Sequence, residues 1–376
     1  MCRLIAVTCD ELMSPVNVLN GLNTMKEGYD GSGMGILLKD LGGPFATMKD
    51  SPILSGIFSS AGIKKLDQFM LNVGFTTKYK ITFKMNAMPP AGVPKRDHYL
   101  VRAYDYPESW RRFTDKELND NLMMIRLQLK KMGEKEKDMI IFSFWPDTVL
   151  IKEIGDPINI ANYLDLGREE LKAKVIMAQG RQNTNHEIDL YACHPFFLQG
   201  FATMTNGENT AFASNRAYLS SRGFSGYNGY CSDSEIFTHT LHYTVKKLGF
   251  DIEAFKHIIT PLQQEMLDGH PDNQLLTHLK QSCRQLIVDG PNCVVGCLPD
   301  NTLFMVHDRK KLRPGIAGGK PGIFAFSSEV SGLDAVIPDR DRTNDYQPMH
   351  RETAIIRPDR KKLMISCQTD ALKIPN

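Results

Sequence analysis

The chain has 376 residues, 42% of them hydrophobic, and its 45 basic and 43 acidic side chains leave a formal net charge of +2. Charges of both signs are mixed along the sequence, which argues against a broad basic surface for nucleic acid. No run of about twenty apolar residues predicts a membrane span, and no basic segment followed by an apolar stretch predicts a secretory signal. The 8 cysteines are scattered, which is typical of a reducing, cytoplasmic setting rather than of a disulfide framework.

Cys2 is the first residue of chemical interest, because only Met1 precedes it. An initiator Met before a small side chain is usually removed, which leaves a cysteine carrying both a thiol and a free α-amine. An α-amine with a pKa of about 7.7–8.0 can accept the proton of a thiol with a pKa of about 8.5. Cys2 is therefore a candidate nucleophile with its own base. The alternative is that it begins an ordinary buried strand, residues 2–8, where cysteine acts as a small apolar residue.

The elements that follow are expected in this order. Residues 14–26 predict a helix, and a glycine-rich turn from Gly28 to Gly35 comes next, before a strand at 36–38. The glycine spacing is G-x-G-x-G and does not match the phosphate-binding G-x-G-x-x-G pattern. We expect this turn to let the backbone approach Cys2 closely.

Residues 60–165 have a different character and predict an α+β insertion. Strands are expected at 80–84, 98–103 and 139–144, and a charged amphipathic helix at 115–132. The insertion interrupts what is otherwise one domain over the whole chain.

The remainder returns to strand-rich sequence. Strands are expected at 175–179 and 196–204, and helices at 234–248 and within 251–286. Five more strand candidates follow, at 293–298, 302–307, 322–326, 353–357 and 363–366. Strands at both ends of a chain that enclose helices favour stacked sheets with helices outside.

Metal and cofactor sites are not expected. Cys293 and Cys297 are four apart in an apolar strand-like run, which puts both on one face of a strand and favours a core position. His239 and His242 share a helical face, but no acidic residue has the spacing of a known zinc motif.

Arg181 begins the segment Arg-Gln-Asn-Thr-Asn, just beyond a strand that looks buried. A fixed guanidinium at that place can bind a carboxylate through two parallel hydrogen bonds. A surface salt bridge is the simpler alternative.

Asn206 and Gly207 follow the apolar strand 196–204. Asn-Gly is the commonest two-residue hairpin turn, and this explanation needs no function. The functional alternative is that the Asn206 amide and the Gly207 backbone N–H form an oxyanion hole.

Ser232-Asp-Ser-Glu235 opens a predicted helix. Ser-x-x-Glu is a capping box, which explains Ser232 and Glu235 structurally. Asp233 would then remain free to hold a substrate ammonium. Together with Arg181 it would bind an amino acid by both ends and present a side-chain carboxamide, as in glutamine or asparagine, to the Cys2 thiol.

In this order, these residues resemble the class II glutamine amidotransferase domain of the N-terminal nucleophile superfamily, and most closely the glutaminase domain of glutamate synthase. The resemblance runs over most of the chain. Its motifs are Cys2, Gly28-Tyr-Asp-Gly-Ser-Gly33, Arg181-x-x-Thr184-Asn185, His194-Pro-Phe196, Asn206-Gly207-Glu208, Ser232-Asp233-Ser-Glu235, and the segments 308–315 and 327–334.

The resemblance implies an α+β protein with a four-layer αββα fold. It implies that Cys2 is the nucleophile and its α-amine the base, with Asn206 and Gly207 stabilising the oxyanion. Arg181 and Asp233 would bind the two ends of glutamine, and Thr184 would line the pocket. No cofactor is implied.

The expected activity is hydrolysis of glutamine to glutamate and ammonia through a Cys2 thioester. The chain has no room for a synthase domain, so the ammonia is expected to pass to a separate glutamate-synthase-like subunit. Two alternatives stay open: an N-terminal nucleophile hydrolase of another amide, or a catalytically degenerate subunit with an assembly or regulatory role.

Overall fold

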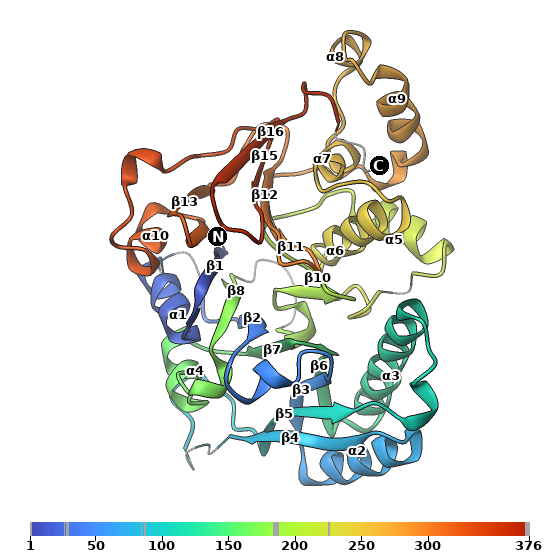
Figure 1. Ribbon diagram of the computed structural model, residues 1–376, viewed down its shortest axis with the longest axis vertical. Coiled ribbons are helices and arrows are strands. Elements are labelled where there is room, and N and C mark those ends of the chain that lie inside the picture. Colours follow the sequence, from blue (N-terminus) through green and yellow to red (C-terminus); the bar gives the residue numbers. More distant parts are fainter. Residues whose placement is uncertain are drawn as a thin grey trace.

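The computed structural model describes residues 2–25, 27, 30–83, 85, 88–182, 188–224 and 226–372. These residues form a mixed α/β structure with three sheets, in which every described strand pair is antiparallel (Figure 1). No helix among them is long and apolar enough to cross a membrane.

Sheet A contains the start of the chain and has the strand order β13-β14-β1-β8-β2-β7. The first strand is buried over six consecutive residues, from Leu4 to Cys9, because both faces of the sheet are covered. Arg3 pairs with Gly180, so the chain start lies beside the residues that follow β8. The strands are β1 (Arg3–Met13), β2 (Met34–Leu41), β7 (Thr148–Glu153), β8 (Ala173–Gly180), β13 (Ile316–Lys320) and β14 (Ile323–Ser327).

Sheet C has the order β16-β15-β12-β11-β10-β9. The strand expected at 196–204 is in fact a hairpin, because Gln199 and Gly200 both have positive φ, 49° and 88°, and reverse the chain. The strands are β9 (Phe196–Leu198), β10 (Phe201–Gly207), β11 (Asn292–Cys297), β12 (Leu303–His307), β15 (Glu352–Ile356) and β16 (Leu363–Cys367).

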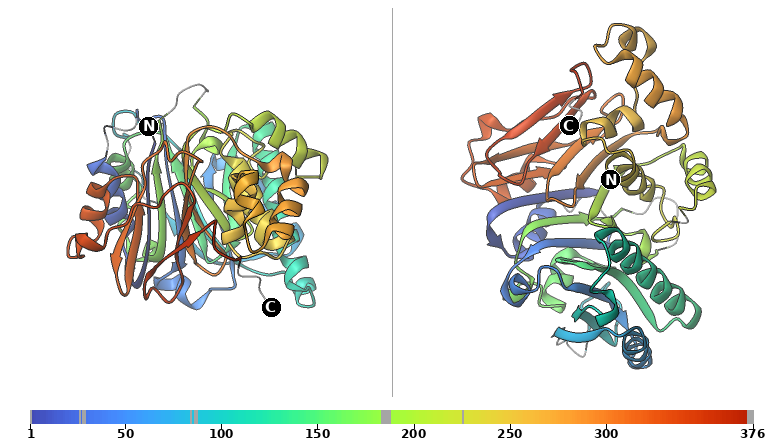
Figure 2. Two further views of the ribbon diagram at one scale, coloured as in Figure 1. Left: turned by 90° about the horizontal axis from the view of Figure 1, so that it is seen from above. Right: turned by 45° about the vertical axis from the view of Figure 1, so that its right-hand side comes forward.

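Sheets A and C share one hydrophobic core, to which Ile5 and Met177 of sheet A and Met204 and Val295 of sheet C belong. Helices cover the outer face of each sheet, and the view from above in Figure 2 shows them on opposite sides of the strands. On sheet A these are α1 (Pro15–Thr24), α4 (Pro157–Tyr163) and α10 (Val330–Val336). On the side of sheet C lie α5 (Phe212–Ser221), α6 (Glu235–His242), α7 (Glu253–Ile259), α8 (Gln264–Asp268) and α9 (Asn273–Ser282).

Sheet B, with the order β4-β5-β3-β6, and its two helices form a separate unit at the bottom of Figure 1. One face of sheet B packs into the shared core through Ile53, Val101 and Phe142. The other face is covered by the helices and centred on Phe75, whose ring makes an edge contact with that of Trp110 at 5.2 Å. The elements are β3 (Pro52–Phe58), α2 (Ser60–Val73), β4 (Thr76–Thr82), β5 (His98–Asp105), α3 (Asp115–Glu136) and β6 (Met139–Pro146).

The boundaries of this unit differ from the expected insertion at 60–165. Sheet B begins at Pro52 and ends at Pro146, whereas β7 pairs with β2 of sheet A and α4 packs beside α1. Three strands that were not expected, β3, β7 and β13, also appear. Strand pairing depends on partners distant in sequence, so local pattern alone did not assign these segments.

Candidate functional site

A cavity of about 250 Å³ lies where the start of β1 meets the ends of β8 and β10. Four of the six expected site residues line it: Cys2, Arg181, Gly207 and Asp233. Asn206 is not among the described lining residues, and Thr184 lies outside the described part of the chain. The structure therefore brings together a thiol, a guanidinium and a carboxylate that are far apart in the sequence.

Cys2 is placed by the strand ladder of sheet A. Its neighbour Arg3 pairs with Gly180, and the backbone N–H of Gln182 donates to Cys2 Sγ at 3.4 Å. Burial raises the pKa of the Cys2 thiol, and this outweighs the opposing effects of the Gln182 hydrogen bond and the positive charge of Arg181. The thiol is therefore protonated at neutral pH and needs a base before it can attack a carbonyl carbon.

Arg181 is buried, with 8% of its surface exposed, so the alternative of a surface salt bridge is wrong. Its backbone N–H donates to Gly33 O at 2.8 Å, and Ser32 Oγ donates to Arg181 O at 3.3 Å. The glycine-rich turn thus supports the arginine. Gly28 and the residue after it lie outside the described residues, but Gly35 shows why the turn needs glycine: a Cβ there would lie 1.8 Å from His194 O.

Asn206 and Gly207 end β10, paired with Cys293 and Asn292 of β11, so the alternative of a hairpin turn at this position is wrong. Gly207 has φ of 139°, and a Cβ on it would lie 1.9 Å from Pro291 O. Asn206 is 1% exposed, and its Nδ2 has no hydrogen-bond partner among the residues that the structure describes. Neighbouring side chains on a strand point to opposite faces, which fits the observation that Gly207 lines the cavity and Asn206 does not.

The sequence suggested that the Asp233 carboxylate is free, but in the structure it accepts three hydrogen bonds. Its Oδ2 accepts from Asn209 N at 2.6 Å, and its Oδ1 accepts from Ser232 Oγ and Ser234 Oγ, each at 3.3 Å. A carboxylate offers about four acceptor positions, so one remains for a further donor from the cavity.

The predicted capping box at Ser232 is wrong. The residue at the N-cap of α6 is Ser234, which makes no side-chain cap hydrogen bond. Glu235 turns instead toward the preceding loop, where its carboxylate accepts from the backbone N–H groups of Asn228 at 2.7 Å and Tyr230 at 2.8 Å. These two loop donors outcompete the cap because they are buried and need an acceptor.

A buried hydrogen-bonded group in the cavity wall was missed as a functional feature. Thr205 N donates to His194 Nδ1 at 3.0 Å, and Gln179 Nε2 donates to Thr205 O at 2.8 Å. Burial, helped by the charges of Lys152 and Arg181, holds the pKa of His194 well below its usual range, so the ring is neutral. The sequence signal was the motif His194-Pro-Phe196, to which no role was assigned.

A metal role is not supported by the described residues, which contain no group of three or more His, Cys, Asp or Glu placed to hold an ion. Cys293 and Cys297 are buried in the shared core, as expected from their spacing in β11.

Comparison by sequence found few relatives. No family model matches the chain. An uncharacterized protein of Archaeoglobus fulgidus is 28% identical over 258 residues, which cover 66% of this chain and 66% of that protein. The match therefore spans just under two thirds of the relative's length.

Three solved structures align with the chain at low sequence identity. Glutamine phosphoribosylpyrophosphate amidotransferase from B. subtilis, complexed with ADP and GMP, aligns with 12% identity and a TM-score of 0.47. A structure of the allosteric regulatory enzyme of purine biosynthesis aligns with 12% identity and a TM-score of 0.49. Each alignment covers 99% of this chain and 50% of the other, so the chain spans about half the length of these proteins.

A glutamine aminotransferase class-II domain protein from Silicibacter pomeroyi aligns with 11% identity and a TM-score of 0.36, over 58% of this chain and 85% of that one. Likenesses at these identities and TM-scores do not assign an activity. The function is argued below from the cavity.

Proposed function

We propose that the chain is a class II glutamine amidotransferase that hydrolyses glutamine, with Cys2 as its nucleophile. The observation that carries the proposal is that the Cys2 thiol, the Arg181 guanidinium and the Asp233 carboxylate line the same cavity. A guanidinium and a carboxylate in one small cavity are complementary to the two charged ends of a free amino acid. The thiol is the group that would meet its side chain.

Each residue has a stated role in the proposal. Arg181 binds the substrate α-carboxylate and Asp233 binds the α-ammonium with its remaining acceptor position. The Gly207 N–H and the Asn206 amide stabilise the oxyanion. The buried Nδ2 of Asn206, which has no hydrogen-bond partner in the described part of the chain, supports this role, because a buried donor without an acceptor costs free energy unless a ligand satisfies it. Thr184 lines the substrate pocket.

The reaction begins with transfer of the Cys2 thiol proton to the α-amine of Cys2, exposed once Met1 is removed. The sulfur then attacks the carboxamide carbon, the C–N bond breaks, and the nitrogen takes up the proton and leaves as ammonia. Water adds to the resulting γ-glutamyl thioester and the C–S bond breaks, which releases glutamate and restores the thiol. The raised pKa of the Cys2 thiol is why the amine is needed as a base.

The proposal extends to architecture and partners. The shared core of sheets A and C, with helices outside both, supports the four-layer αββα N-terminal nucleophile fold, and the sheet B unit is the insertion. Ammonia is a diffusible product, and we propose that a separate, glutamate-synthase-like subunit consumes it.

The test is glutamate release from glutamine by protein whose intact mass shows that Met1 is absent. Cys2→Ala should lower the rate by about a thousandfold or more, because it removes the nucleophile. Cys367→Ala is the matched control, since Cys367 is a partly exposed free cysteine on β16 and should leave the rate unchanged.

Three results would contradict the proposal. Unchanged glutamate release by Cys2→Ala would exclude the Cys2 thiol as the nucleophile. Hydrolysis of other amides without labelling by a glutamine-mimicking electrophile would favour a different amide hydrolase. A native chain that keeps Met1 and has no activity would favour the non-catalytic subunit.

A further inference from the structure

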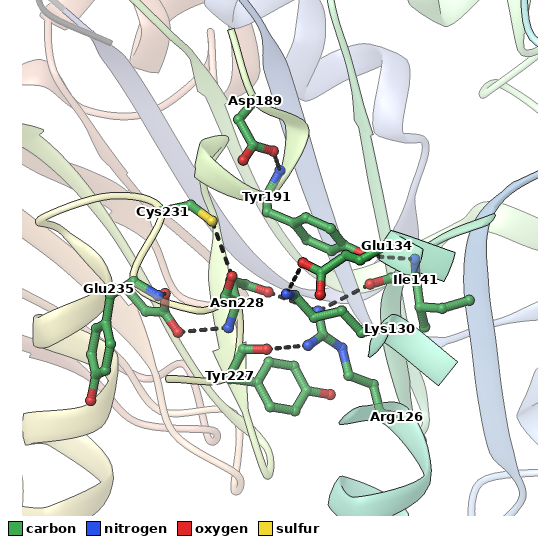
Figure 3. A network of polar contacts seen from close by, with 11 residues as sticks. Arg126, Lys130, Glu134, Ile141, Asp189, Tyr191, Tyr227, Asn228, Cys231 and Glu235 are labelled. Carbon is green, nitrogen blue, oxygen red and sulfur yellow. Dashed lines mark hydrogen bonds and ion pairs between the residues drawn. The ribbon is translucent and has the colours of Figure 1, made fainter. Parts of the chain in front are cut away.

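Helix α3 of the sheet B unit carries a buried arginine that contacts the loop containing Asp233. Arg126 is 0% exposed, and its guanidinium donates to three carbonyl oxygens (Figure 3). Two belong to the loop of residues 226–234: Tyr227 O and, at 2.7 Å, Asn228 Oδ1. The third is Ile141 O of β6, at 3.0 Å. One side chain thus joins the sheet B unit to the loop that contains Asp233.

The guanidinium is also stacked on the same loop. Arg126 Cζ lies 3.9 Å from the centroid of the Tyr227 ring, which is close enough for a cation–π contact. A buried charge whose acceptors are neutral carbonyls is costly to desolvate, and an apolar side chain would fill the space more cheaply. A guanidinium supplies several donors spread over a rigid plane, which suits acceptors on two separate segments, whereas the donors of a lysine all sit on one nitrogen.

A second contact links the sheet B unit to the segment that precedes Ala192. The backbone N–H of Ile141 donates to Tyr191 Oη at 3.1 Å, and Lys130 Nζ lies 4.7 Å from the Tyr191 ring centroid. Tyr191 is followed directly by Ala192, which lines the cavity together with His194. The sheet B unit therefore holds two separate segments of the cavity wall.

The part of the loop from Asn228, which Arg126 contacts, to Asp233 is short and is held by several hydrogen bonds. Glu235 accepts from the backbone N–H groups of Asn228 and Tyr230, and Cys231 Sγ donates to Asn228 O at 3.1 Å. Figure 3 shows Arg126 and Glu235 approaching the loop from opposite sides at Asn228. A displacement at Asn228 would accordingly be carried along the loop toward Asp233.

We propose that Arg126 is a positioning residue through which the sheet B unit sets the affinity of the cavity for its amino-acid substrate. The inference rests on the proposed function, because it assigns the loop the task of presenting Asp233 to the substrate ammonium. Arg126 touches neither the substrate nor the thiol. Its loss should weaken glutamine binding while leaving the reactivity of Cys2 intact.

The experiment compares Arg126→Lys with Lys131→Met, which changes an exposed basic residue on the same helix. Lysine keeps the positive charge, but its donors sit on one nitrogen and cannot reproduce the planar, spread donor set that reaches both the loop and β6. Arg126→Lys should raise the glutamine KM about tenfold with little change in kcat, since lost hydrogen bonds to a charged group correspond to about that factor. Backbone hydrogen exchange in residues 226–235 should accelerate by a similar factor, and Lys131→Met should change neither.

The two readouts separate this inference from the proposed function. If the wild-type protein neither binds nor hydrolyses glutamine, the proposed function fails, and with it the substrate role of Arg126. If the wild type is active but exchange in 226–235 is unchanged in Arg126→Lys, the positioning role alone is overturned. Faster exchange with an unchanged KM would likewise overturn it, because the loop would then move without affecting the substrate. Iodoacetamide alkylation of Cys2 should proceed at the wild-type rate in both variants.

A second variant keeps the test decisive if Arg126→Lys does not fold. Asn228→Ala removes one acceptor from the loop side and leaves the arginine in place. It should raise the glutamine KM in the same direction by a smaller factor. An unchanged KM in a folded Asn228→Ala protein would contradict the proposal.

Discussion

Two walls of the candidate cavity are built in different ways. The strand wall, with Cys2 and Arg181, is held by backbone pairing in sheet A, where Arg3 pairs with Gly180. The loop wall, residues 226–234 with Asp233, is held mainly by side chains, above all Glu235 and Arg126. Backbone hydrogen bonds survive most side-chain substitutions, whereas a hydrogen bond made by a side chain is lost when that one residue is replaced. The strand wall should therefore tolerate side-chain changes that the loop wall does not.

The largest effect is expected where a substitution disturbs the backbone beside the strand wall. Gly207→Ala would place a Cβ 1.9 Å from Pro291 O at a φ of 139°, which only glycine adopts readily. We expect a loss of about 3 kcal/mol in the free energy of unfolding, measured by urea denaturation. Gly269→Ala is the control, because nothing lies within 4 Å of its Cβ, and it should change stability by less than about 0.5 kcal/mol. Equal stability of the two variants would contradict the account of β10.

An intermediate effect is expected in the loop wall, and it should depend on pH. Burial alone would raise the pKa of Glu235, but hydrogen bonds from His239 and from the backbone of Asn228 and Tyr230 lower it overall. A carboxyl with a depressed folded pKa stabilises the protein above its unfolded pKa of about 4.3, and this contribution is lost as the pH falls through the folded value. Glu235→Gln should therefore cost about 2 kcal/mol at pH 7.

The difference between wild type and Glu235→Gln should shrink as the pH falls below about 4. The measurement is urea unfolding of both proteins between pH 3 and pH 7. A gap that stays constant over this range would show that the charge of Glu235 does not hold the loop.

The smallest effect is expected for Arg3, which lies next to the nucleophile but points away from it. Its side chain donates to Met25 O at 3.3 Å and pairs with Glu329 at 2.8 Å, on the side of sheet A that faces α1 and α10. Arg3→Gln should cost less than about 1 kcal/mol, because the partner Glu329 is 40% exposed. The alkylation rate of Cys2 should be unchanged, and a tenfold change would show that the strand wall is not insulated from its side chains.

Local patterns predicted many of the elements. The helix after Ser14 begins where a cap was available, since Ser14 accepts from Val16 N, and α3 begins at Asp115 as expected. The spacing of Cys293 and Cys297 predicted their burial in β11. Two local solutions did not form. The hairpin turn, offered as the alternative to a functional Asn206-Gly207, gave way to pairing with β11, and the Ser232 capping box gave way to backbone N–H groups of the preceding loop.

The sequence by itself determined the amphipathic elements and the chemical groups of the candidate site, because periodicity, caps and residue type are local properties. It did not determine that Arg181 is buried, that Glu235 faces a loop, or that Arg126 of a separate unit supports that loop. The positions of Arg181 and Arg126 arise from pairing and packing between segments that are far apart in the chain. For Glu235, burial decides which of the nearby hydrogen bonds forms. Tertiary structure thus decided how the candidate groups are held.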